Sequence, residues 1–140
     1  MTTPNKFAVL LKPTDEQPAL DRAAQYSRVD PSISVVAVRV VNNYKEENVE
    51  QITLKEKANF EMLKRKYASI KNFDFKVVFD KNVAGGFNAE CKTGNYSLAV
   101  ISANKRHALK DLFISNVDSQ IMRKCTIPLL VVRDASSTAP

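Results

Sequence analysis

The sequence is poor in the residue types on which many functional sites depend. It holds one histidine, two cysteines, three glycines and no tryptophan among 140 residues. The cysteines, Cys91 and Cys125, stand in separate segments without C-x-x-C spacing, which indicates buried free thiols rather than a disulfide framework or a zinc site. Neither a G-x-S-x-G elbow nor an H-E-x-x-H pair occurs, and His107 has no motif-placed nucleophile beside it. We therefore expect no metal site and no catalytic residue, and we interpret His107 as a surface residue of a basic loop, with a general base as the alternative.

Long apolar runs are missing as well. No stretch of about 18 apolar residues occurs, and the first residues, MTTPNK, lack the charged-then-apolar pattern of a secretory signal. These absences exclude a membrane-spanning helix of the usual kind. We expect a soluble, cytoplasmic protein that makes no membrane contact.

The charge is unbalanced, with a formal net value of +6. Such a surplus can attract nucleic acid or phosphate ligands. The lysines, however, alternate with glutamates, as in YKEENVEQITLKEK, which is typical of a solvated helix face. Interleaved aromatic residues and a basic strip are absent, so the sequence does not favour nucleic-acid binding.

Short apolar, β-branched runs alternate with longer segments of helical period, a pattern typical of βα units around a parallel sheet. The five predicted strands cover residues 7–12, 33–41, 75–79, 97–102 and 128–133. The predicted helices lie within residues 15–29, with Pro18 in the first turn, and over about 45–70, 82–93 and about 115–125. We expect one α/β domain over residues 1–134, a three-layer α/β/α sandwich with a five-stranded parallel sheet, and a disordered tail over residues 135–140.

Three features of the predicted helices bear on function. Gly85 and Gly86 each weaken the third helix by about 1 kcal/mol, and we interpret them as close packing of the helix on the sheet, with a ligand loop as the alternative. Asp15 and Glu16 precede the first helix and fit stabilisation of its positive end, with acid/base chemistry as the alternative. The long helix carries its apolar stripe at Val49, Ile52, Phe60, Leu63, Tyr67 and Ile70.

Ligands of an open parallel sheet bind outside the carboxyl ends of its strands. In this chain that edge comprises KPTDE after the first strand, NNY after the second and SANKRH at the end of the fourth. The last of these opens a segment, residues 101–118, that contains no glycine. A phosphate-binding loop at this place would ordinarily be rich in glycine.

The frame of this segment resembles the universal stress protein family, and the resemblance covers nearly the whole chain. The family's signature is a strand, then G-x2-G-x9-G-[S/T], a helix and a final strand opening with proline. Here SLAVIS aligns with the strand, and Pro128 is in register at the last strand. The glycine and hydroxyl positions of the signature fall, in order, on Ser102, Lys105, Ser115 and Asn116. DEQPAL near the start and RKC before the last strand are most similar to E-type, tandem-domain members, which often have degraded motifs.

The resemblance implies a fold, a ligand site and an assembly. The fold is adenine nucleotide alpha hydrolase-like, with strand order 3-2-1-4-5. Members that bind ATP usually carry an aspartate at the end of the first strand, where this chain has Lys12. The nucleotide site would comprise Lys12, Val41, Ser102, Lys105, Arg106, Ser115 and Asn116. Members commonly form homodimers by pairing the last strand, here residues 128–133, which as a long apolar edge invites pairing. Another domain of the family could take the same place, and a loop or the tail covering the edge is the alternative.

The substitutions act against nucleotide binding by the usual loop. Glycines form a concave nest of N–H groups around phosphates, and side chains at Ser102, Lys105 and Ser115 obstruct that approach. Asp118, at the third position of the fourth helix, would occupy the N–H groups that an anion uses. We expect a non-enzymatic domain with no cofactor, acting in stress response through protein association. The alternative is a switch that binds ATP or AMP through Lys12, Lys105 and Arg106, aided by His107 and Lys110, with at most weak ATP hydrolysis.

Overall fold

The computed structural model describes residues 5–103 and 116–133 and contains a five-stranded parallel sheet in the order β3-β2-β1-β4-β5. The strands are β1 (Lys6–Leu10), β2 (Ser34–Val41), β3 (Asn72–Phe79), β4 (Leu98–Ala103) and β5 (Leu129–Arg133). The helices are α1 (Pro18–Val29), α2 (Val49–Lys66), α3 (Val83–Thr93) and α4 (Asn116–Lys124), and a 3-10 turn at Glu46–Asn48 precedes α2. The predicted fold class and strand order are confirmed.

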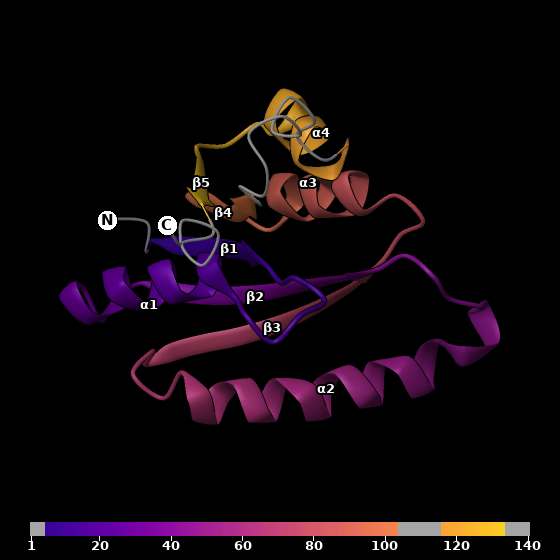
Figure 1. Cartoon of the computed structure of the whole chain (residues 1–140), viewed down its shortest axis with the longest axis horizontal. Helices are drawn as coiled ribbons and strands as arrows, with labels where there is room; N and C mark the ends of the chain where they lie inside the picture. The colour runs from indigo at the N-terminus through magenta and orange to yellow at the C-terminus, as the bar shows by residue number, and fades with distance from the viewer. Residues whose placement is uncertain (1–4, 104–115, 134–140) are drawn as a thin grey trace, which may run out of the picture.

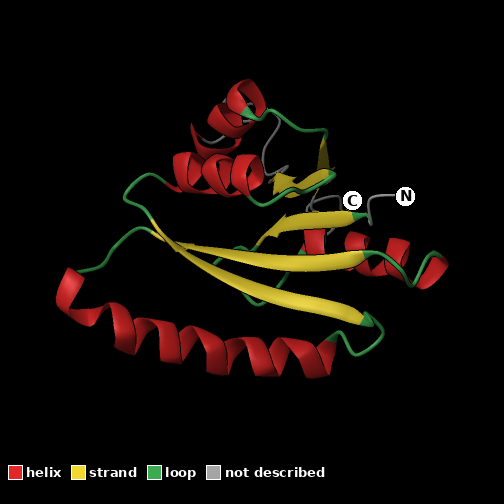
Figure 2. Cartoon of the chain, turned by 180° about the vertical axis from the view of Figure 1, so that it is seen from behind, coloured by secondary structure: helices red, strands yellow, loops and turns green. Residues whose placement is uncertain are grey.

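Helices cover both faces of the sheet, as Figures 1 and 2 show. On one face, α1 and α2 bury Leu20, Ala23 and Phe60 against strand residues such as Val9 and Val35. On the other face, α3 and α4 bury Phe87 and Ile121 against a second set of strand residues that includes Val38 and Ile101. The central strands are buried on both sides, which explains why their sequences are continuously apolar.

The predicted boundaries differ from the observed ones mainly at β3 and α2. β3 begins three residues earlier than predicted, at Asn72, because it is an edge strand whose exposed and half-buried residues alternate. α2 is shorter than the predicted 45–70. It ends at Lys66, yet Tyr67 and Ile70 of the predicted apolar stripe are still buried. Within residues 5–103 and 116–133, no helix is long and apolar enough to cross a membrane.

The two glycines of α3 have different surroundings. A Cβ atom on Gly86 would lie 2.8 Å from Cβ of Asp80 and 3.1 Å from Cγ1 of Val40, so only a glycine lets α3 approach the sheet this closely. A Cβ atom on Gly85 would meet nothing nearer than the Asn82 side chain at 3.5 Å, an ordinary contact. Close helix-to-sheet packing therefore accounts for Gly86 and leaves Gly85 unexplained.

Candidate functional site

Four of the seven predicted site residues lie within the described part of the chain, and three of them lie at or near the carboxyl ends of strands. Lys12 follows β1 by two residues and is half-buried, Val41 is the last residue of β2, and Ser102 is the penultimate residue of β4. Asn116 is the first residue of α4. The remaining three, and two accessory residues, lie outside the described residues: Lys105, Arg106 and Ser115, with His107 and Lys110.

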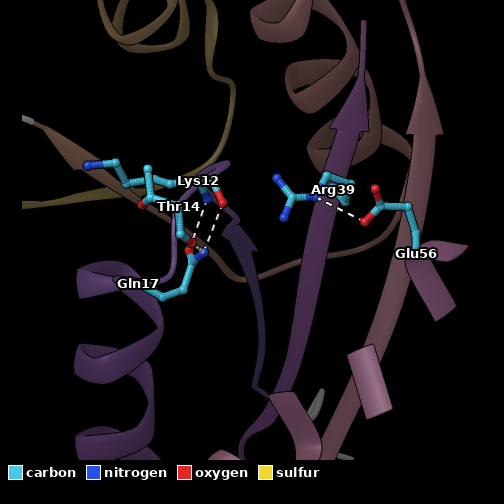
Figure 3. A network of polar contacts seen from close by, with 5 residues as sticks. All are labelled: Lys12, Thr14, Gln17, Arg39 and Glu56. Carbon is cyan, nitrogen blue, oxygen red and sulfur yellow. Dashed lines mark hydrogen bonds and ion pairs between the residues drawn. The ribbon is translucent and has the colours of Figure 1, made fainter. Parts of the chain in front are cut away.

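A glutamine that the sequence analysis did not identify organises the loop after β1. Gln17 is 4% exposed, and its Oε1 accepts a hydrogen bond of 2.9 Å from the backbone N–H of Lys12. Its Nε2 donates to the carbonyl oxygens of Lys12 and Thr14, each at 2.8 Å. Figure 3 shows these three bonds closing the loop onto the start of α1. The backbone N–H and carbonyl groups of Lys12 and the carbonyl group of Thr14 are thus engaged within the protein.

Lys12 occupies the strand-end position at which the family's ATP-binding members carry an aspartate. In Figure 3 its side chain extends away from Gln17. Asp15 and Glu16 are exposed and precede α1, a position from which negative charge can stabilise the positive end of the helix. The end of β1 therefore carries the positive charge of Lys12, whereas ATP-binding members of the family carry the negative charge of an aspartate at this position.

Ser102 is buried in β4, with 8% of its surface exposed. Its hydroxyl group has no hydrogen-bond partner among the described residues. Buried hydroxyl groups are nearly always paired with protein or with water, so this group can take a partner at the sheet edge. Asp118 lies in the first turn of α4, as predicted.

A charged pair also lies near this edge of the sheet. Nε of Arg39 in β2 is 3.3 Å from Oε1 of Glu56 in α2, and the side chains are 20% and 18% exposed. Figure 3 shows this contact joining the two elements. The separation is that of an ion pair, although Nε does not form a well-aligned hydrogen bond. In the sequence, this ion pair could have been suspected from Arg39, the one charged residue in the strand SVVAVRVV.

The two cysteines lie near each other, which their separation in the sequence did not predict. Both are free, and Cys91 in α3 is buried, as predicted. Cys125, which follows α4, is only partly buried, so the predicted burial is wrong for this residue. Cys125 packs against the apolar cluster of Cys91 because α3 and α4 adjoin. Burial, aided by the neighbouring Cys125 and Glu90, raises the pKa of Cys91 to about 12.

The described residues contain no group of three or more histidine, cysteine, aspartate or glutamate side chains that could hold a metal ion. In the loop after β1, the cation of Lys12 occurs together with the exposed carboxylates of Asp15 and Glu16. Such a mixed set of charges can contact a protein surface.

Comparisons with known proteins agree on one family. A sequence model described as the universal stress protein family matches residues 7–133. The universal stress protein E homolog of Haemophilus influenzae is 36% identical over 64 residues, which are 46% of this chain and 21% of that protein. The match thus spans about a fifth of that relative's length, and it agrees with the expected similarity to E-type members.

Solved structures share the fold at low sequence identity. Universal stress protein UspA from Lactobacillus plantarum has a TM-score of 0.69 and 13% identity, with 95% of this chain and 100% of that chain covered. The universal stress protein from Archaeoglobus fulgidus, solved in complex with dAMP, has a TM-score of 0.60 and 16% identity, with 94% and 99% covered. The sequence match over residues 7–133 and the shared architecture lead to one conclusion: the chain belongs to the universal stress protein family.

Proposed function

We propose that this chain is a single universal-stress-protein domain, residues 1–134, that acts in stress response through protein association and does not bind ATP by the family's glycine loop. We further propose that it is cytoplasmic and not an enzyme. The observation that carries the proposal is the composition of the segment between β4 and α4. All three glycines, Gly85, Gly86 and Gly94, precede it.

The physical argument concerns the backbone N–H groups that would surround a phosphate. A nest of N–H groups needs residues with positive φ, which is inexpensive for glycine and costs about 1 kcal/mol or more for other residues. Lys105 and Ser115 replace two of the glycines, and Ser102 replaces the first with a side chain in a buried strand. Asp118, in the first turn of α4, adds a negative charge where a phosphate would approach.

The loop after β1 supports the same conclusion. The aspartate that usually contacts adenosine is replaced by Lys12. In addition, Gln17 takes up the N–H group and carbonyl of Lys12 and the carbonyl of Thr14. A nucleoside at this edge would find these backbone groups already engaged.

We propose association through β5, which forms one edge of the sheet. Leu129, Leu130 and Val131 are only partly buried. Because Ala99 N–H donates to Pro128 O, and successive residues point to opposite sides of a strand, Leu129 and Val131 direct their backbone groups to the open edge. The partner is a second copy of the chain or another domain of the same family.

Sedimentation tests this association. Val131→Pro removes an outward N–H group without breaking the β4–β5 ladder, since proline is tolerated on edge strands. Wild type should sediment as a dimer and Val131→Pro as a monomer with unchanged circular dichroism, whereas Val131→Thr should remain dimeric. A folded Val131→Pro variant that stays dimeric, or a wild type that is monomeric at high concentration, would refute pairing through β5.

The second candidate is a nucleotide switch that holds ATP or AMP through Lys12, Lys105 and Arg106. The Archaeoglobus fulgidus relative solved with dAMP favours it, as does the basic residue at the end of β1. Isothermal titration with Mg-ATP and with AMP separates the two functions. The leading proposal predicts no micromolar binding to wild type, whereas the switch predicts binding that Lys12→Ala and Arg106→Ala each abolish.

A gain-of-binding variant sharpens the titration. If the loop survives as a scaffold, Lys105→Gly combined with Ser115→Gly should increase affinity for Mg-ATP, and Lys105→Ala combined with Ser115→Ala should not. An equal effect of the two variants would show that glycine at these positions is not the limiting feature.

A further inference from the structure

The fold places the two thiols of the chain on neighbouring elements. Cys91 belongs to the third turn of α3, and Cys125 follows the last residue of α4. The two helices lie side by side on one face of the sheet in Figures 1 and 2. Cys91 is buried in the cluster on this face together with Phe87 and Ile121, and Cys125 packs against the same cluster.

The two thiols have different surroundings, and we therefore expect them to differ in reactivity. Cys91 is 1% exposed, whereas Cys125 is partly exposed and its Sγ donates a hydrogen bond of 3.4 Å to the carbonyl oxygen of Ile127. A reagent in solution therefore meets Cys125 first. Burial also keeps Cys91 protonated at neutral pH, so it is a poor nucleophile until a reactive sulfur stands next to it.

We propose that Cys91 and Cys125 form an oxidation site, at which a hydroperoxide converts the two thiols into a reversible disulfide that joins α3 to the end of α4. The Cys125 sulfur attacks the terminal peroxide oxygen, the O–O bond breaks, and the leaving oxygen takes the Cys125 thiol proton and departs as an alcohol or water, giving Cys125 sulfenic acid. The Cys91 sulfur then attacks the sulfenic sulfur, the S–S bond forms as the S–O bond breaks, and the leaving hydroxide takes the Cys91 proton and departs as water. The peroxide gains two electrons, and the two thiols lose them.

The placement of both thiols in one packed cluster favours this step without unfolding. A disulfide requires an S–S bond of about 2.05 Å and Cα atoms about 4.4–6.8 Å apart. Because Cys125 packs against the cluster that contains Cys91, rotation about χ1 and a small approach of α3 to the end of α4 would bring the two sulfur atoms together. The new bond would also fix the segment between α4 and β5, which contains Ile127 and leads into the edge strand.

The first experiment treats the full chain with hydrogen peroxide and follows free thiols and intact mass. The expected product has no free thiol, a mass lower by two hydrogen atoms, a Cys91–Cys125 cross-link in a non-reducing peptide map, and full recovery with a reductant. Oxygen addition at Cys125 with Cys91 left as a thiol would overturn the proposal. So would a disulfide between two chains, seen as a dimer on a non-reducing gel.

Matched variants assign the order of the steps. In Cys91→Ala, Cys125 should accumulate as a sulfenic acid that dimedone traps. In Cys125→Ser, the loss of the Cys91 thiol should be slower by at least about tenfold. Equal rates of Cys91 oxidation with and without Cys125 would contradict the assignment. None of these readouts depends on nucleotide binding or on pairing through β5.

Discussion

The substitution Gly86→Ala tests how closely α3 packs on the sheet. The new Cβ atom would lie 2.8 Å from Cβ of Asp80, 3.1 Å from Cγ1 of Val40 and 3.3 Å from Cγ1 of Val78. Cβ of Asp80 is attached to the backbone and cannot rotate away, so we place the overpacking cost at about 2–3 kcal/mol. Alanine gains about 1 kcal/mol in helix propensity over glycine. The free energy of unfolding should therefore fall by about 1–2 kcal/mol.

The neighbouring glycine provides the control. Gly85→Ala is the same substitution in the same helix, but its Cβ atom would meet only the Asn82 side chain at 3.5 Å. The hydrogen bond from the Gly85 N–H to Asn82 Oδ1 does not depend on the side chain. This variant should gain about 0.5–1 kcal/mol. Urea unfolding with an unchanged m-value measures both effects, and a Gly86→Ala variant at least as stable as wild type would refute the packing argument.

Two further substitutions test buried hydrogen bonds. Gln17→Leu removes three bonds and leaves the Lys12 N–H without its partner, so chemical denaturation should show a loss of about 2–3 kcal/mol; a loss below about 0.5 kcal/mol would contradict the role of Gln17. Tyr67→Phe removes the 2.6 Å bond to Asp21 and should cost about 1 kcal/mol at neutral pH. Burial, followed by hydrogen bonds to carboxylates, raises the pKa of both Tyr67 and Tyr96, so their stabilisation is complete below about pH 10 and is lost as the pH rises above it. Absorbance at alkaline pH should show these two phenols ionising only on unfolding, and ionisation while the chain is still folded would contradict their burial.

The layout of the fold was predictable from the sequence because most of the strands are compact apolar runs. β2 and β4, which are covered on both faces, were located within one residue of their observed ends. β3 was less predictable because an edge strand alternates exposed and buried residues, and its first residues, NFD, do not form an apolar run. The order of the strands came from the family resemblance, since composition does not determine which strands pair.

Contacts between distant segments were not predictable. In the sequence, Gln17 is one of several polar residues in DEQPAL. Its role depends on how the loop folds back so that the backbone of Lys12 meets the Gln17 side chain. The Arg39–Glu56 pair and the packing of Cys125 against the cluster of Cys91 each join elements whose mutual placement depends on the assembled sheet. The residues at the carboxyl edge were identified because the ends of parallel strands meet there whatever the loops contain.

The nucleotide content of the purified chain tests the central claim most directly. The protein is expressed, purified without added nucleotide and denatured, and the supernatant is examined by absorbance and mass spectrometry. Because the segment after β4 has no glycine and Lys12 replaces the adenosine-contacting aspartate, we expect no adenine nucleotide to copurify. Stoichiometric ATP or AMP in the supernatant would contradict the account and support the side-chain nucleotide switch.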